Sequence, residues 1–223
     1  MMRQIFLDTE TTGLDPNQGH RIIEVAAIEF INRQTTNNRF HFYVNPQREI
    51  DAAAQEVHGI TLDFLSDKPF FKDIATDFIS FIKDSELVIH NAPFDVGFLN
   101  MEFGKIGLDK LDSYCDGIID SLKFAKELRP GQRNSLDALC RAFSVDNSTR
   151  SLHGALLDAQ LLGEVYIQMT RGQEAFTINF EEDTSKTAFN SVDHADLIVI
   201  QPLQEEVEAH NTYLKSINRK DVW

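Results

Sequence analysis

The order of β-rich and helical segments is the feature that most constrains the fold of this chain. Polar links of seven residues or so separate three leading β-prone segments, and short links of this kind favour antiparallel pairing. Shorter β-prone segments then alternate with segments of helical spacing. The strands are expected at 4–9, 21–31, 40–45, 86–90 and 117–120, and the helices at 70–82, 93–103, 121–128, 135–143 and 154–170. This order predicts an α/β fold: a mixed sheet, in which an antiparallel three-strand meander is followed by parallel strands, flanked by helices.

The regular pattern ends near residue 171. Residues 172–193 are polar and lack periodicity, which predicts a flexible linker. Beyond them, a β-prone run at 197–200 precedes apolar residues at helical spacing over 203–217. A solvated tail is one interpretation, and a segment that orders against a partner protein is the other. The second is favoured because these apolar residues have no core of their own. We therefore expect a domain at 1–171, a linker at 172–193 and a partner-binding tail at 194–223.

Composition limits the classes of function. With 223 residues and 42% hydrophobic content, the chain can build one substantial core. The net charge of −14 argues against a protein that holds nucleic acid by bulk electrostatics, so any such ligand would need bound cations or a partner protein. No apolar stretch approaches the ~18 residues of a membrane span, and the first residues lack the apolar run of a secretory signal. We expect a cytoplasmic protein, with Cys115 and Cys140 as reduced thiols.

Two acids end the first strand, in the sequence IFLDTETTG. Side chains two residues apart on a strand share a face, so Asp8 and Glu10 point the same way as Phe6, while Ile5 and Leu7 pack on the other face. Like charges on a partly buried face repel and lose hydration unless cations lie between them. A solvated turn is the alternative interpretation, and the pair alone does not decide between them.

Asp95 follows another expected strand, in VIHNAPFDVGF. It falls in the first turn of a predicted helix, where an acid also complements the helix dipole. Its place just beyond a buried strand puts it within reach of a ligand that the first strand also contacts. His90, at the end of that strand, is interpreted as structural.

A third acid interrupts an apolar helix face in SLHGALLDAQLL. Five residues separate His153 from Asp158, which on a continuous helix would turn the two side chains apart. Gly154 allows the chain to break there, which places His153 on a loop at the start of the helix. A titratable histidine beside an acid-bearing helix is suited to act as a general base.

Together, DTET, NAPFD and HGALLD, in this order, resemble the DEDD exonuclease superfamily, in the subgroup with a histidine base. Longer stretches, VHGIT, HNAPFD, RNSLDALC and LHGALLDAQLLGEVY, resemble the epsilon subunits that proofread for bacterial DNA polymerase III. The resemblance covers residues 3 to 171 closely and the tail more loosely. It implies a ribonuclease-H-like fold and a 3′→5′ exonuclease that removes mispaired nucleotides from DNA during replication.

The resemblance also implies roles for individual residues. Two divalent cations, Mg²⁺ or Mn²⁺, would be held by four carboxylates, and His153 would take the proton from the attacking water. The implied metal ligands are Asp8, Glu10, Asp95 and Asp158, and the implied substrate contacts are Asp8, Thr9, Glu10, His58 and Asp158. Ala53 departs from the family, which has a glutamate five residues before the histidine, so that contact is not carried over.

The resemblance implies partners as well. The substrate would be a single-stranded 3′ terminus of DNA, and the tail would bind the polymerase catalytic alpha subunit. A small theta-type subunit is implied too, and Gln173, Phe176 and Ile178 loosely match a sliding-clamp-binding peptide. Two alternatives stay open: an RNA-trimming exoribonuclease with the same catalytic residues, and a catalytically silent polymerase scaffold.

Overall fold

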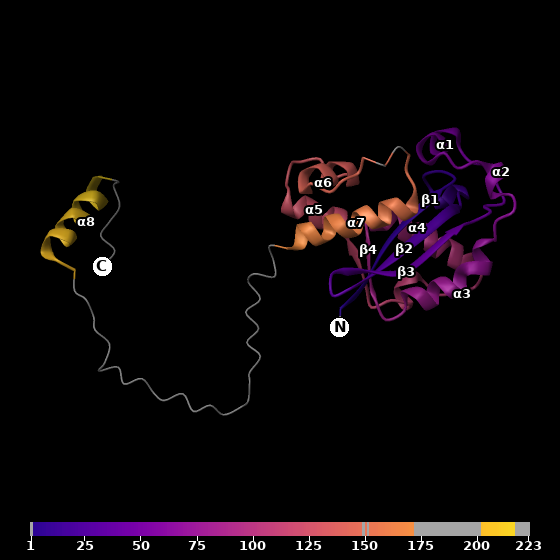
Figure 1. Ribbon diagram of the computed structural model, residues 1–223, viewed down its shortest axis with the longest axis horizontal. Coiled ribbons are helices and arrows are strands. Elements are labelled where there is room, and N and C mark those ends of the chain that lie inside the picture. Colours follow the sequence, from indigo (N-terminus) through magenta and orange to yellow (C-terminus); the bar gives the residue numbers. More distant parts are fainter. Residues whose placement is uncertain (1, 149, 151, 172–201, 217–223) are drawn as a thin grey trace, which may run out of the picture. The chain divides into compact units, whose positions relative to one another are not determined.

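The computed structural model describes residues 2–148, 150, 152–171 and 202–216 (Figure 1). It divides the chain into two units, Met1–Thr177 and Ile178–Trp223, which are described separately. Among the described residues, no helix has the length and apolar character needed to cross a bilayer. The predicted clamp peptide at 173–178 and the β-prone run at 197–200 lie outside the described residues.

The first unit is a five-stranded sheet with helices on both faces. The strands are β1 (Arg3–Thr11), β2 (Ile22–Ile31), β3 (Gln34–Tyr43), β4 (Glu86–Ile89) and β5 (Gly117–Asp120). The α-helices are α1 (Ala52–His58), α2 (Leu62–Leu65), α3 (Phe71–Ile82), α4 (Ala92–Lys105), α5 (Ser121–Leu128), α6 (Leu136–Phe143) and α7 (Ala155–Thr170). Short 3-10 helices lie at Pro16–Gln18 and Leu111–Ser113.

The sheet has the order β3-β2-β1-β4-β5. The pairs β1–β2 and β2–β3 are antiparallel, whereas β1–β4 and β4–β5 are parallel. The predicted meander followed by parallel strands is therefore confirmed. Because β1 and β4 run the same way, their carboxyl ends meet at one edge of the sheet.

Alternating side chains of β1 divide between two cores. Ile5 and Leu7 pack with α3 and α4 on one face, while Phe6 packs with α6 and α7 on the other. Figure 1 shows α3 and α7 on opposite sides of the sheet. Helix α7 packs closely on β2 at Gly163. A Cβ at this position would come within 2.5 Å of the Phe30 ring, so the close approach requires a glycine.

The third strand begins earlier than predicted. It was expected at 40–45, with residues 32–38 as a link, but β3 starts at Gln34 and pairs with β2 through a two-residue turn. Asn32 and Arg33 have φ values of 48° and 67°, the left-handed backbone that tight hairpin turns of this kind require. The residues after the turn are mostly exposed and polar, so no apolar alternation marks the start of the strand.

Helices α1 and α2 were not predicted, because residues 52–65 lack a clear apolar period. Helix α1 stops at Gly59, whose φ of 72° favours glycine. Its last residue, His58, is buried. The second unit contains α8 (Gln204–Ser216), which confirms the helix expected at 203–217.

Candidate active site

The acids of β1 and α4 meet where the two parallel strands end. Helix α4 follows β4 after Asn91, whose left-handed φ of 67° turns the chain sharply, so that Asp95 falls in the first helical turn. Thr9 faces Asp95 from β1, and its Oγ1 donates a hydrogen bond of 2.7 Å to Asp95 Oδ1. The hydroxyl of Thr9, predicted to contact substrate, therefore holds an acid in place.

Asp158 and His153 approach from α7 and the loop before it. Asp158 is buried in the first turn of α7, on the face of the sheet that also carries Asp8 and Glu10. His153 lies on the preceding loop, as predicted, and its Nδ1 is 3.7 Å from Asp158 Oδ2. One ligand atom from each of Glu10, His153 and Asp158 falls within 4.8 Å of the others. The backbone N–H of His153 also donates to the carbonyl of Val57 in α1, at 3.1 Å.

Burial and neighbouring negative charges disfavour the ionised forms of these acids. Burial, followed by the charges of Asp95, Glu10 and Asp158, raises the pKa of Asp8 well above its ordinary value. Burial, with Glu24 and Asp158, raises the pKa of Glu10 to about 8. Burial raises the pKa of Asp95 to about 7, against the opposing hydrogen bond from Thr9. Buried oxygen donors whose ionised forms are disfavoured in this way fit a hard divalent cation such as Mg²⁺ or Mn²⁺, whose charge would favour ionisation.

A cavity of about 410 Å³ adjoins these acids. Its walls come from the end of β1, the following loop, α1 and α4, and they are mainly apolar; it is lined by Thr9, Glu10, Thr11, Gly13, Leu14, Asp51, Ala53, Ala54, Val57, His58 and Phe94. A second cavity, of about 500 Å³, is lined by Asp8, His153 and Asp158 together with residues of α5 and α6. The acids therefore lie between two concave surfaces.

Comparison with known proteins places this geometry in a family. A family model described as exonuclease matches residues 5–166. The DNA polymerase III subunit epsilon of Rickettsia felis is 49% identical over 222 residues, which cover 97% of each chain. That of Haemophilus influenzae is 46% identical and covers 98% of this chain and 91% of its own. The chain belongs to the DNA polymerase III epsilon subunit family. It is an exonuclease-domain enzyme, as predicted.

Solved structures agree with the fold. Exonuclease X, in complex with 5′ overhanging duplex DNA, superposes with a TM-score of 0.60 at 28% identity, over 78% of this chain and 93% of its own. The nuclease domain of 3′hExo, a DEDDh family member bound to rAMP, gives a TM-score of 0.66 at 19% identity, over 76% and 92% of the two chains. The second likeness supports the fold alone. The predicted ribonuclease-H-like architecture is confirmed.

In this epsilon-family chain, His58 is a buried neutral donor. The backbone N–H of Ile60 donates to His58 Nδ1 at 3.0 Å, so the proton of the neutral ring is on Nε2. Burial lowers the pKa of His58. Nε2 is enclosed and finds no hydrogen-bond partner of good geometry among the described residues, although the Thr11 backbone is close enough to favour protonation of the ring. A buried donor of this kind, at the wall of the 410 Å³ cavity, is suited to a polar group of a ligand.

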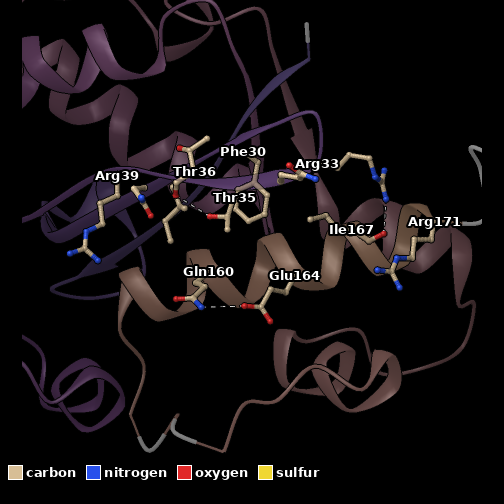
Figure 2. Close-up of a pocket in the computed structure, with 12 residues that line it drawn as sticks. Phe30, Arg33, Thr35, Thr36, Arg39, Gln160, Glu164, Ile167 and Arg171 are labelled. Carbon is tan, nitrogen blue, oxygen red and sulfur yellow. Dashed lines mark hydrogen bonds between the residues drawn. The ribbon is translucent and has the colours of Figure 1, made fainter.

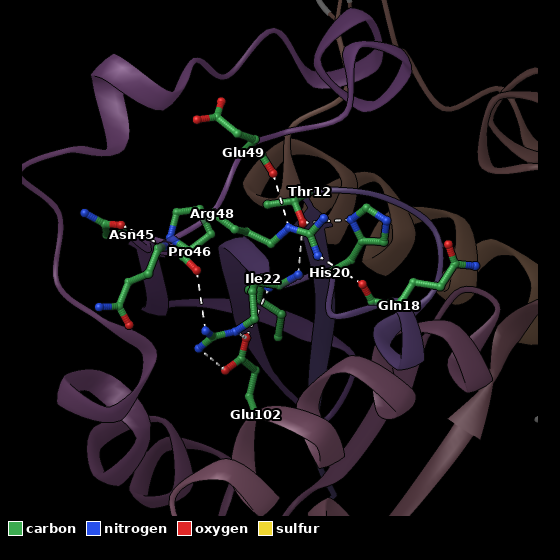
Figure 3. A network of polar contacts seen from close by, with 11 residues as sticks. Thr12, Gln18, His20, Ile22, Asn45, Pro46, Arg48, Glu49 and Glu102 are labelled. Carbon is green, nitrogen blue, oxygen red and sulfur yellow. Dashed lines mark hydrogen bonds and ion pairs between the residues drawn. The ribbon is translucent and has the colours of Figure 1, made fainter.

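A polar network fixes the loop after β1 (Figure 3). Thr12 Oγ1 accepts from the backbone N–H of Arg21 at 3.0 Å and lies 3.1 Å from His20 Nδ1. The ring of His20 packs on Gly13 so closely that a Cβ there would come within 2.3 Å of it. Arg21 is in turn held by a bidentate ion pair with Glu102 of α4, at 2.6 and 2.7 Å. The loop that lines the cavity is therefore anchored to both β2 and α4.

Sequence reasoning missed Glu24, which anchors the start of α7. Gly154 has no side chain to cap this helix; instead, Glu24 Oε2 accepts from the backbone N–H of Ala155 at 3.2 Å. The other oxygen, Oε1, lies 2.7 Å from His41 Nε2. Glu24 is only 2% exposed and pairs with Glu10 across β1 and β2. An acid within the apolar run RIIEVAAIEFI was the available signal.

A larger cavity, of about 770 Å³, lies between the β2–β3 hairpin and α7 (Figure 2). Arg33, Arg39 and Arg171 line it together with Gln160 and Glu164, which face it from α7. Of the predicted site residues that the structure describes, none lines it. The cavity of 770 Å³ is therefore separate from the cluster of acids, although it is larger than the two cavities that adjoin them.

Proposed function

We propose that this chain is a 3′→5′ exonuclease that removes mispaired 3′-terminal nucleotides from DNA, as a subunit of the replicative DNA polymerase III core. The observation that carries the proposal is the convergence of Asp8, Glu10, Asp95 and Asp158 with His153 at one edge of the sheet. Family membership supports it, as does the likeness to Exonuclease X in complex with DNA.

The acids and the histidine would have different roles, in cation binding and in proton transfer. The four carboxylates would hold two divalent cations, Mg²⁺ or Mn²⁺. When bound, such cations stabilise negative charge on a phosphodiester and make a water molecule a stronger nucleophile. His153 would take the proton of the attacking water on its imidazole, and 48% exposure of its side chain leaves that proton a route to solvent.

The 410 Å³ cavity would receive the terminal nucleotide. Leu14, Val57 and Phe94 offer apolar contact to a base and sugar, and His58 Nε2–H offers one donor. Apolar contact is tolerant of base identity, so selectivity would arise from fraying: a mispaired end costs less to unpair than a matched one. Ala53 lines this cavity without adding a polar group.

The partners are proposed from family membership and charge. A chain with a net charge of −14 gains little from bulk attraction to DNA, so the primer end would be delivered by a polymerase partner. Residues 194–223 would bind the catalytic alpha subunit, and 172–193 would act as a flexible linker that raises effective concentration. A theta-type subunit, and a sliding clamp bound through Gln173, Phe176 and Ile178, complete the assembly, which would work in the cytoplasm.

The test is nucleotide release from a single-stranded DNA oligomer labelled at its 5′ end. We expect Mg²⁺- or Mn²⁺-dependent release of 5′-mononucleotides, which Asp8→Ala abolishes and Asp109→Ala, an exposed acid between α4 and the second 3-10 helix, leaves intact. Activity that survives Asp8→Ala would refute the proposal. Faster degradation of a matched RNA oligomer would favour the RNA-trimming alternative, and failure to bind Mn²⁺ would favour the silent scaffold.

A further inference from the structure

Arg150 makes a bidentate ion pair with one of the carboxylates of the active site. Its Nε donates to Asp158 Oδ1 at 2.5 Å, and its Nη2 donates to Asp158 Oδ2 at 2.6 Å. Both side chains are 6% exposed, so water contributes little to either partner. Paired hydrogen bonds between a guanidinium and a carboxylate are among the stronger polar contacts in proteins. Both oxygens of Asp158 are thus engaged by a cationic side chain of the same chain.

Further contacts hold the guanidinium in this position. Arg150 Nη1 donates to Asp137 Oδ1 at 2.9 Å, and Asp137 also accepts from Asn147 Nδ2 at 3.0 Å. The backbone N–H of Arg150 donates to the carbonyl of Asn147 at 3.0 Å. Asp137 belongs to α6 and Asp158 to α7, so Arg150 links the two helices.

The same guanidinium also donates a hydrogen bond to His153, the proposed base. Arg150 Nη2 lies 2.9 Å from His153 Nδ1, and because arginine can only donate, Nδ1 must accept. A neutral imidazole that accepts at Nδ1 carries its proton on Nε2. The ring then has no free lone pair to take a proton from water.

We propose that Arg150 is a positioning residue that takes the place of a cation at Asp158 and blocks His153 until a divalent cation displaces it. The inference rests on the proposed function. Because a guanidinium stays charged at any ordinary pH, cation concentration controls the exchange. The arrangement neutralises Asp158 when no cation is bound, and it keeps the base inactive until the cation that the reaction needs has arrived.

The first test measures Mn²⁺ binding to the full-length, metal-free protein by calorimetry. If the Arg150 guanidinium competes with the cation for Asp158, Arg150→Gln should bind Mn²⁺ about tenfold more tightly than the wild type. This factor corresponds to about 1.4 kcal/mol. Arg141→Gln, on the exposed part of α6, makes the same change of charge and should leave the affinity unchanged. Equal or weaker binding by a folded Arg150→Gln would overturn the proposal.

A charge-conserving variant separates displacement from general electrostatics. Arg150→Lys keeps the positive charge but cannot form the two parallel hydrogen bonds to Asp158. Displacement predicts tighter Mn²⁺ binding than in the wild type, by a factor of about three, whereas electrostatics alone predicts no change. An unchanged affinity in Arg150→Lys would therefore overturn the proposal. Absence of Mn²⁺ binding in the wild type would instead defeat the proposed function, so the two failures are distinguishable.

A spectroscopic measurement on the wild type needs no variant. The Arg150 Nε–H, buried against Asp158, should give a downfield NMR resonance that exchanges slowly with water in metal-free protein. Saturating Mg²⁺ should shift this resonance and speed its exchange, because the pair is broken. A resonance that Mg²⁺ leaves in place, with its exchange rate unchanged, would show that Arg150 stays on Asp158 and would overturn the proposal.

The two calorimetric tests depend on folded variants. Thermal unfolding of Arg150→Gln, Arg150→Lys and Arg141→Gln establishes that each one is folded.

Discussion

Replacing Glu10 by glutamine should stabilise the metal-free protein at alkaline pH while removing its activity. The pKa of Glu10 is raised from 4.5 to about 8, by burial and by the charges of Glu24 and Asp158. A folded-state pKa above the unfolded value means that the folded protein binds the proton more tightly. Stability from this group is therefore complete below about pH 4.5 and is lost as pH rises toward 8.

The size of the effect follows from the shift. Each pKa unit is worth about 1.4 kcal/mol, so the full shift sets an upper limit of about 5 kcal/mol above pH 8. Glu10 is partly exposed and neighbouring acids can take up protons in its place, so we expect about half of that. In a domain of this size, 1 kcal/mol changes the melting temperature by about 2–4 °C. Glu10→Gln should therefore melt several degrees above the wild type at pH 9.

The assay is thermal unfolding in a chelator, at pH 5 and pH 9. The advantage of Glu10→Gln should be large at pH 9 and small at pH 5, and Glu127→Gln, at an exposed position of α5, should match the wild type at both. In a parallel measurement without the chelator, added Mg²⁺ should raise the melting temperature of the wild type at pH 9 and have less effect on Glu10→Gln. Equal melting temperatures of the wild type and Glu10→Gln at pH 9 would refute the reasoning, because the carboxylate would then not be strained by its neighbours.

Three further substitutions test other parts of the structure. His153→Gln should lower kcat by about 10²–10⁴ and leave Mn²⁺ binding within a few-fold, as calorimetry and single-turnover kinetics would show; a near-normal kcat would exclude it as the base. Glu24→Gln weakens the acceptor of the Ala155 N–H, so it should cost about 1–2 kcal/mol in urea unfolding and also slow catalysis. An unaffected rate would show that this anchor does not position the site. Gly163→Ala should cost about 1–3 kcal/mol, because its Cβ would fall 2.5 Å from the ring of Phe30; an unchanged unfolding midpoint would mean that α7 can move away freely.

Backbone periodicity placed each acid on its element, but the grouping of the acids into one site came from the family resemblance. Side chains two apart on a strand must share a face, which placed Asp8 and Glu10 together, and Asp95 was expected just beyond the end of a second strand. Asp158 was detectable as an acid on an apolar helix face. The break at Gly154 was enough to separate His153 from the helix.

The supporting residues could not be located in the same way. Arg150 reaches Asp158 through a loop whose path no periodicity specifies, and Glu24 faces the site only because β2 pairs with β1 in one particular register. The hairpin at Asn32 and Arg33 was hidden because arginine is a poor indicator of a left-handed turn. Contacts between segments distant in the chain depend on side-chain packing, which a local pattern does not contain.

The hydrogen bond from the His153 backbone to Val57 has a mechanical consequence. The helix that ends in His58 forms one wall of the proposed nucleotide cavity, and the loop that carries the proposed base is tied to that same helix. A terminal nucleotide that pushes this wall outward must also displace the imidazole. The fit of the nucleotide and the alignment of the proton acceptor are therefore not independent, and a poorly seated end would be cut slowly even if it bound well.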